Sequence, residues 1–243
     1  MTDDGPGGDA GVTVDGAPFS APVRAWFDSA FPEPTVAQRR AWPPISAGEH
    51  TLLCAPTGSG KTLAAFLWAI DRLGGDPRAE GTGTRVVYLS PLRALAVDIE
   101  KNLRSPIRGI ELAAQRLGEP FSAPSVGLRT GDTSPEERRR MAKRPPDILV
   151  TTPESLYLLL TSAAREGLAA VETVIVDEIH ALAPTKRGAH MALSLERLHT
   201  WVTGRGHRAP QRIGLSATQR PLETVAEFLG GRDVRGSVST ARP

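Results

Sequence analysis

Six short runs of apolar and β-branched residues recur along the chain, and polar residues, glycines or prolines separate them. Runs of this length and composition predict strands that are buried on both faces of a sheet. The six runs are Thr51–Ala55, Arg85–Ser90, Ser125–Thr130, Ile148–Thr152, Thr173–Asp177 and Arg212–Ser216.

Amphipathic segments with helix signals lie between these runs. Four apolar residues fall at the spacing of one helical face, namely Leu63, Phe66, Leu67 and Ile70. Ser134–Glu137 is a capping box with proline at the first helical position, and Thr152–Ser155 starts another helix directly after a strand. A last helix is predicted from Pro221 to Leu229, with Gly230 and Gly231 as its stop signal.

This alternation of short strands and helices predicts an α/β fold, with a mostly parallel central sheet and helices on both faces. In such sheets ligands bind at the carboxyl ends of the strands. The residues with candidate chemistry all lie at such ends.

Composition narrows the class of protein. The 243 residues are 40% hydrophobic and 23% charged, which is globular composition and enough chain for one α/β domain. A net charge of +2 does not by itself indicate a nucleic-acid partner. The single cysteine, Cys54, excludes an internal disulfide framework and a four-thiolate zinc site. It fits a reducing cytoplasm, and no apolar stretch approaches the ~18 residues of a membrane span, so no membrane partner is expected.

The two ends of the chain differ from its middle. Residues 1–20 are rich in glycine and aspartate and predict a disordered leader. The folded domain is expected from residue 21 to residue 235, and residues 236–243 are expected to be a linker or truncated tail.

A phosphate-binding loop is predicted between the first strand and the first helix after it. The sequence there is Ala55-Pro56-Thr57-Gly58-Ser59-Gly60-Lys61-Thr62. Small residues let backbone N–H groups close around phosphate oxygens, and the helix N-terminus adds partial positive charge. Lys61 would reach the β- and γ-phosphates, and the Thr62 hydroxyl would bind Mg²⁺. The general phosphate-loop pattern has glycine at the position of Ala55. The alternative interpretation of this segment is a glycine-rich turn between a strand and a helix that binds no ligand.

Two carboxylates end the fifth predicted strand, in the sequence Val174-Ile175-Val176-Asp177-Glu178-Ile179-His180. Adjacent acids at the end of a buried strand are costly unless a cation or hydrogen bonds stabilise them. Asp177 fits as a Mg²⁺ partner, and Glu178 fits as the base that orients or deprotonates an attacking water. An isolated Asp-Glu pair would indicate only a solvated strand end, and His180 alone would be an ordinary polar residue.

A third signature, Gly214-Leu215-Ser216-Ala217-Thr218-Gln219, ends the last predicted strand. The hydroxyls of Ser216 and Thr218 either cap the next helix or relay the state of the phosphate site through hydrogen bonds.

The order of these motifs resembles the first motor lobe of a superfamily 2 DExH helicase, a RecA-like P-loop NTPase lobe. Three longer stretches resemble the Lhr-type (large helicase-related) proteins: TGDTSPEERRRMAKRPPDILVTTPESLYLLLTS, VIVDEIHALAPTKRGAH and RIGLSATQRPLE. The resemblance covers about Phe31 to Gly231. It implies ATP and Mg²⁺ as cofactors, and a Q motif at Phe31–Gln38 in which Gln38 reads the adenine.

The resemblance also implies a nucleic-acid contact surface and coupling residues. The residues expected to hold a single strand by its backbone are Pro91, Arg93, Thr130, Gly131, Thr151, Thr152 and Pro153. His180, Ser216 and Thr218 would couple hydrolysis to strand separation. Arg129–Arg144 holds six basic and three acidic residues, and either extends this track or is a solvated helix.

The function that follows is an ATP-binding lobe of a translocase acting on single-stranded DNA, with 3′-to-5′ polarity and unwinding of DNA or RNA:DNA duplexes. Only 24 residues follow Gln219, too few for the second RecA-like lobe that supplies arginine fingers, so we expect the isolated chain to be nearly inactive. Two alternatives stay open: a DExH RNA helicase lobe, and a nucleotide-gated nucleic-acid-binding module without turnover. A P-loop kinase leaves the later motifs unexplained.

Overall fold

In the computed structural model, which describes residues 18–76, 83–217, 222–231 and 239–241, all strand pairs are parallel and form one sheet. The strand order is β3-β4-β2-β5-β6-β1-β7. The strands are β1 Thr51–Cys54, β2 Val86–Leu89, β3 Val126–Arg129, β4 Ile148–Thr151, β5 Thr173–Val176, β6 Gln211–Ser216 and β7 Ser239–Ala241. The six predicted runs are therefore confirmed as strands.

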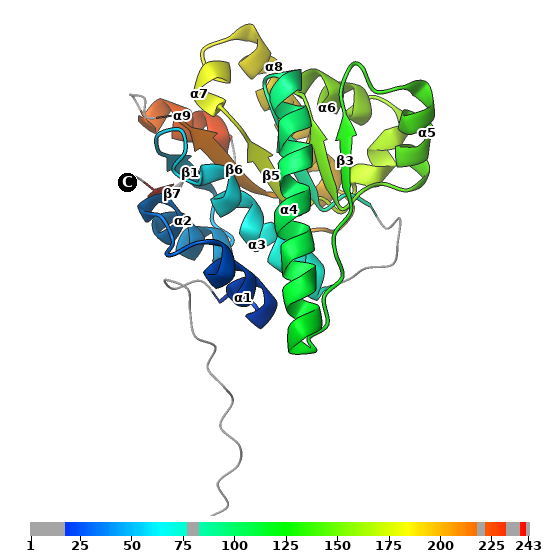
Figure 1. The fold of residues 1–243 in the computed structure, drawn as a ribbon. Coiled ribbons are helices and arrows are strands. Elements are labelled where there is room, and N and C mark those ends of the chain that lie inside the picture. The colour runs from blue at the N-terminus through cyan, green and yellow to red at the C-terminus, as the bar shows by residue number, and fades with distance from the viewer. Residues whose placement is uncertain (1–17, 77–82, 218–221, 232–238, 242–243) are drawn as a thin grey trace, which may run out of the picture.

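Helices connect the strands and cover both faces of the sheet (Figure 1). The α-helices are α1 Ala21–Ala30, α2 Val36–Ser46, α3 Lys61–Gly75, α4 Arg93–Leu117, α5 Pro135–Lys143, α6 Pro153–Leu160, α7 Ile179–Leu182, α8 Lys186–Thr203 and α9 Leu222–Gly230. One 3₁₀ helix, η1, spans Ala163–Leu168. No helix in these ranges is long and apolar enough to cross a bilayer.

The sheet has a hydrophobic core on each face, because successive side chains of a strand point to opposite faces of the sheet. On one face Leu53 and Tyr88 pack with apolar residues of α1, α2, α3 and α4. On the other face Leu52 and Leu89 pack with residues of α6, α7, α8 and α9. This arrangement confirms the predicted fold, and it explains why the strands are apolar on both sides.

Local signals fix where the helices begin and end. The predicted capping box of α5 is present, since Ser134 Oγ accepts from Glu137 N and the Glu137 side chain accepts from Ser134 N. Thr152 caps α6 by accepting from Ser155 N, as its sequence predicts. Helix α9 ends at Gly230, and Gly231 has a positive φ of 73°.

The structure corrects two predicted boundaries and the predicted burial of one strand. Phe19 lies within the predicted leader, yet it is buried and its ring is 5.0 Å from that of Trp42. Strand β3 is half-buried and not fully buried, because it lies at the edge of the sheet. Part of the predicted tail forms β7, which pairs with β1 from Thr51 to Leu53. The rest of the leader and of the tail lies outside the described residues.

The strand register brings the functional segments to one edge. Cys54 is level with Ser216, Leu89 with Val176, and Leu89 with Thr151. Ala55 N donates to Ser216 O at 3.2 Å, and Asp177 N donates to Leu89 O at 2.9 Å. The segments after β1, β2, β4, β5 and β6 therefore leave the sheet side by side.

Candidate functional site

The loop between β1 and α3 has the backbone of a phosphate-binding loop. Gly58 and Gly60 adopt φ values of 82° and 80°, which glycine reaches without steric cost. A Cβ on Gly60 would lie 2.6 Å from Gln38 Nε2, so the loop packs directly against the side chain of Gln38 in α2. Thr57 and Gly58 are exposed, whereas Ser59 is half-buried.

Lys61 begins α3, and its side chain reaches back across the loop. Its Nζ donates to Ala55 O at 2.5 Å and to Pro56 O at 2.7 Å. Burial lowers the pKa of Lys61, while the carboxylates of Glu178 and Asp177 act in the opposite direction. The ammonium is thus held at the mouth of the loop, and the half-buried Thr62 follows it in the first turn of α3.

Helix α2 is fastened to this loop by its own cap. Thr35 and Gln38 form a capping box in which Gln38 Oε1 accepts from Thr35 N at 2.9 Å. Thr35 Oγ1 also donates to Ser59 O at 2.8 Å. Gln38 is therefore buried beside Gly60, with its amide oxygen held by the helix start. The contribution of Thr35 escaped the sequence reasoning, although the spacing of Thr35 and Gln38 matches a capping box.

The two carboxylates at the end of β5 face the loop in different ways. Asp177 is 9% exposed, and its Oδ1 accepts from Glu178 N at 2.9 Å. Its Oδ2 accepts a short hydrogen bond from the hydroxyl of Tyr88. Burial raises the pKa of Asp177, and the hydrogen bonds from Tyr88 and from the Glu178 backbone limit the rise. Glu178 is half-buried, with a left-handed backbone at φ 46°.

His180 joins the acidic segment to the segment after β6. Its Nδ1 accepts from Ala217 N at 3.3 Å and lies 3.4 Å from Glu178 Oε2. Ser216 Oγ donates to Ala217 O at 2.9 Å. Thr218, the other predicted coupling residue, lies outside the described residues.

The residues present fit a magnesium-bound nucleoside triphosphate. Ser59 Oγ is buried without a hydrogen-bond partner in the described chain, which is a cost that a phosphate oxygen would remove. Among the described residues, no group of three or more His, Cys, Asp or Glu side chains is arranged so that it could hold a metal ion by itself. Mg²⁺ commonly takes only one or two protein oxygens and completes its shell with phosphate and water. Thr62 and Asp177 supply that kind of donor set.

A second group of predicted residues follows β2, β3 and β4, on the other half of the same edge. It consists of Pro91, Arg93, Thr130, Gly131, Thr151, Thr152 and Pro153. The three threonines are buried, and their hydroxyls already take part in local bonds. Thr151 Oγ1 donates to Arg129 O at 2.6 Å, and Thr130 Oγ1 accepts from Asp132 N at 3.3 Å. The hydroxyl groups of these threonines therefore stabilise the loops and are not exposed on the surface.

Arginines connect these loops to one another. Arg93 is exposed and its Nη1 donates to both carboxylate oxygens of Asp132, at 2.8 and 3.0 Å. Arg187 in α8 donates from Nε to Glu154 Oε1 at 2.7 Å and from Nη2 to Pro91 O at 2.9 Å. Arg187 therefore ties the segment after β2 to the start of α6. Its role was missed because the two partners are distant in sequence.

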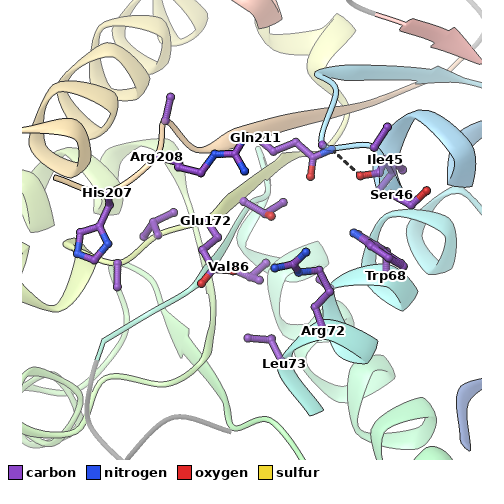
Figure 2. A pocket seen from close by; sticks show the side chains of 17 residues that line it. Ile45, Ser46, Trp68, Arg72, Leu73, Val86, Glu172, His207, Arg208 and Gln211 are labelled. Atoms are coloured by element: carbon purple, nitrogen blue, oxygen red, sulfur yellow. Dashed lines mark hydrogen bonds between the residues drawn. The ribbon is translucent and has the colours of Figure 1, made fainter. Parts of the chain in front are cut away.

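A cavity of about 450 Å³ lies at the opposite edge of the sheet (Figure 2). Its lining includes Val86, Thr173 and Gln211, which are the first residues of β2, β5 and β6. Gln211 Nε2 donates to Ile45 O at 2.9 Å in its wall. Because ligands of such sheets bind at the carboxyl ends of the strands, this cavity is distinct from the candidate site.

A parallel sheet with a phosphate-binding loop after β1 and adjoining carboxylates after β5 defines a RecA-like P-loop nucleotide-binding lobe. The DEAD/DEAH box helicase family model matches residues 35–228, and the chain belongs to this family. The resemblance to Lhr-type proteins, predicted from the sequence, is confirmed by the relatives that follow.

Two curated relatives illustrate this similarity. The chain is 61% identical to the Lhr helicase/probable uracil glycosylase of Mycolicibacterium smegmatis over 214 residues, which are 88% of this chain and 14% of that protein. It is 49% identical to the ATP-dependent helicase Lhr-Core protein 2 of Thermococcus barophilus, covering 86% of this chain and 24% of that protein. The chain thus spans about a seventh to a quarter of the length of these relatives.

A solved structure agrees with this similarity. The structure of Mycobacterium smegmatis helicase Lhr bound to ssDNA and AMP-PNP superposes with a TM-score of 0.84 at 59% identity. The match covers 91% of this chain and 28% of that one. Mss116p bound to ssRNA and AMP-PNP, at 20% identity and a TM-score of 0.69, shares the fold.

Proposed function

We propose that this chain is the ATP-binding lobe of an ATP-dependent helicase that moves along single-stranded DNA. The observation that carries the proposal is the division of one sheet edge into two adjoining halves. The candidate residues after β1, β5 and β6 adjoin one another, and we assign them to the nucleotide; those after β2, β3 and β4 lie on the other half of the edge, and we assign them to the nucleic acid. The Lhr structure with ssDNA and AMP-PNP bound supports both assignments.

On the nucleotide half, the loop backbone from Thr57 to Gly60 binds the phosphates, and Lys61 contacts the β- and γ-phosphates. To do so, the Lys61 ammonium exchanges its bonds to Ala55 O and Pro56 O for phosphate oxygens. Gln38 lies behind Gly60, where it would read the adenine edge of a bound nucleotide.

Hydrolysis falls to the acidic pair. Thr62 and Asp177 would hold Mg²⁺, which neutralises charge that develops on the phosphates. Glu178 would orient or deprotonate the attacking water, since its half-buried carboxylate is the more accessible of the acidic pair. His180 lies between Glu178 and Ala217, so it would sense the state of Glu178 and pass it to the segment after β6.

On the nucleic-acid half, backbone amides and Arg93 would contact phosphates, which position a strand without reading its sequence. The bonds of Thr130, Thr151 and Thr152 hold those loops in place. Helix α5 has no buried residue and carries several arginines, so its outer face would extend the basic track. By resemblance to the family, we extend the proposal to 3′-to-5′ movement and to the unwinding of DNA or RNA:DNA duplexes.

The experiment measures ATP hydrolysis and nucleotide binding in a longer chain that includes the following lobe, with and without single-stranded DNA. We expect stimulation by DNA in the wild type. Glu178→Gln should keep ATP binding and lose turnover by at least about 10²-fold, because general base catalysis contributes about that much. Glu119→Gln, an exposed glutamate remote from the loop, serves as the matched control.

The same experiment separates the two alternatives. Stimulation by single-stranded RNA but not by DNA would replace the DNA helicase with an RNA helicase lobe. Equal nucleotide-dependent binding of DNA by the wild type and Glu178→Gln, with no turnover in either protein, would identify a nucleotide-gated binding module. Loss of nucleotide binding in Glu178→Gln would refute the assignment of Glu178 as the base.

A further inference from the structure

Tyr88 is a buried polar group that the roles above do not use. It lies in the middle of β2, is fully buried, and its ring stacks on that of Phe66 with centroids 5.0 Å apart and planes at 28°. A phenolic hydroxyl in an apolar core is costly unless it has a partner. The partner is Asp177 Oδ2.

The strand register makes this contact possible. Tyr88 is level with Ile175 on the neighbouring strand, and Asp177 lies two residues further along on the same face. Diagonal neighbours of this kind are within reach of a long aromatic side chain. The hydroxyl therefore reaches the carboxylate from inside the core, on the side away from solvent.

The contact fixes the orientation of the Asp177 carboxylate. Glu178 N donates to Oδ1 and Tyr88 donates to Oδ2, so each oxygen has one fixed donor and keeps one lone pair for another partner. The rotation of the carboxylate plane is set by these two donors. The Tyr88 ring is itself held by Phe66, which belongs to α3, the helix that begins with Lys61 and Thr62.

We propose that Tyr88 is a positioning residue that aims Asp177 at the magnesium ion of the bound nucleotide. The proposal rests on the proposed function, since it takes Asp177 as part of the magnesium site. Through Phe66, Tyr88 and Asp177, the helix that carries the phosphate-binding lysine and the strand that carries the acidic pair are held in one arrangement.

The test measures equilibrium binding of a fluorescent ATP analogue in Mg²⁺ and in EDTA. The ratio of the two affinities gives the gain that magnesium provides. Tyr88→Phe removes only the hydroxyl and should reduce this gain about tenfold, as is usual when a group that orients a metal ligand is lost. Binding in EDTA should stay unchanged. Tyr157→Phe is the matched control, because Tyr157 and Tyr88 are the only tyrosines of the chain and Tyr157 is exposed.

Further arms keep the outcomes distinct. In Asp177→Asn the gain in affinity that Mg²⁺ provides should already be small. Because Tyr88 acts through Asp177, adding Tyr88→Phe to this variant should lower the gain no further. With ¹³C at the tyrosine hydroxyl carbon, the wild type gives two NMR signals, and only that of Tyr88 should shift when Mg²⁺ and nucleotide are added. Because this measurement is made on the wild type, it does not depend on whether the Tyr88→Phe protein folds.

An unchanged magnesium gain in a folded Tyr88→Phe protein would overturn the inference about Tyr88 and leave the proposed function standing. So would a Tyr88 signal that does not respond to Mg²⁺ and nucleotide. If the wild type does not bind the analogue in Mg²⁺ at all, the proposed function fails together with the inference.

Discussion

Glu178 combines an unfavourable backbone with a central position in the site. Its left-handed conformation, φ 46° and ψ 38°, costs a residue with a Cβ on the order of 1–2 kcal/mol. The bond from Glu178 N to Asp177 Oδ1 stabilises it, and the turn leads directly into α7. The strained turn separates the two carboxylates, so that one is buried and the other is accessible.

At the residue scale, Lys61→Ala should weaken triphosphate binding about 10- to 100-fold, because a hydrogen bond to a charged group contributes about 1.5–3 kcal/mol. The effect should be smaller for a nucleoside monophosphate, which lacks the phosphates that lysine would contact. Titration calorimetry with both nucleotides measures the difference. Lys101→Ala, on the exposed side of α4, should change neither affinity.

The positions of the candidate site residues were predictable where the sequence pattern is local. Lys61 and Thr62 follow a glycine-rich turn, and Asp177 and Glu178 end an apolar run, so their proximity follows from the topology of a parallel sheet. Tyr88 and Arg187 gave no such signal. In the sequence, Tyr88 looks like any other large residue of a buried strand. Only the register between β2 and β5 brings its hydroxyl to the carboxylate of Asp177.

At the element scale, the start of the sheet is held by a pH-sensitive contact. His50, just before β1, accepts from Arg212 N at its Nδ1 over 2.8 Å, which ties β1 to the start of β6. Burial lowers the pKa of His50, and electrostatic interactions with Arg212 and with His199 add to this effect. Protonation of Nδ1 would also remove the acceptor of this bond.

The consequence is a loss of stability in mild acid. Below about pH 6.5, the ordinary pKa of imidazole, His50 binds a proton in the unfolded chain but not in the native state. The free energy of unfolding should therefore decrease as the pH falls below this value. Thermal unfolding measured between about pH 5 and pH 8 tests it. His50→Gln keeps an acceptor that does not titrate and should flatten this dependence, whereas His207→Gln, at an exposed position, should not.

Secondary structure followed the local sequence closely, and the errors have tertiary causes. Strand β3 has an apolar run like the others, but its position at the sheet edge leaves it half-buried. The sequence assigns Phe19 to a polar leader, yet its side chain is buried. The rings of Trp42 and Trp68 cover it, with centroids 5.0 and 5.8 Å from that of Phe19. Burial of a single aromatic residue depends on surfaces that come from α2 and α3.

At the scale of the whole molecule, the candidate site lies along the carboxyl edge of the sheet. The chain spans 14% of the length of its Mycolicibacterium smegmatis relative. We propose that a second RecA-like lobe faces the carboxyl edge of the sheet and completes the nucleotide site.

Extension of the chain through that lobe should raise DNA-stimulated ATP hydrolysis about 10³- to 10⁵-fold, the contribution of an arginine finger. The measurement compares the 243-residue chain with the extended chain at equal concentration, with and without single-stranded DNA. Duplexes with a 3′ or a 5′ single-stranded tail test unwinding and its polarity in the extended chain. Strong stimulation or unwinding by the short chain alone would show that its catalytic set is already complete.

The sequence by itself determined the class of fold, the glycine-rich turn between β1 and α3, and the acidic end of β5. These depend on hydrophobic periodicity, glycine and capping residues, which act over a few neighbouring positions. The tertiary structure alone decided which groups restrain these residues: Tyr88 on Asp177, Arg187 between Glu154 and Pro91, and Thr35 on Ser59. Those contacts require strand register and helix packing, because their partners come from different elements of the chain.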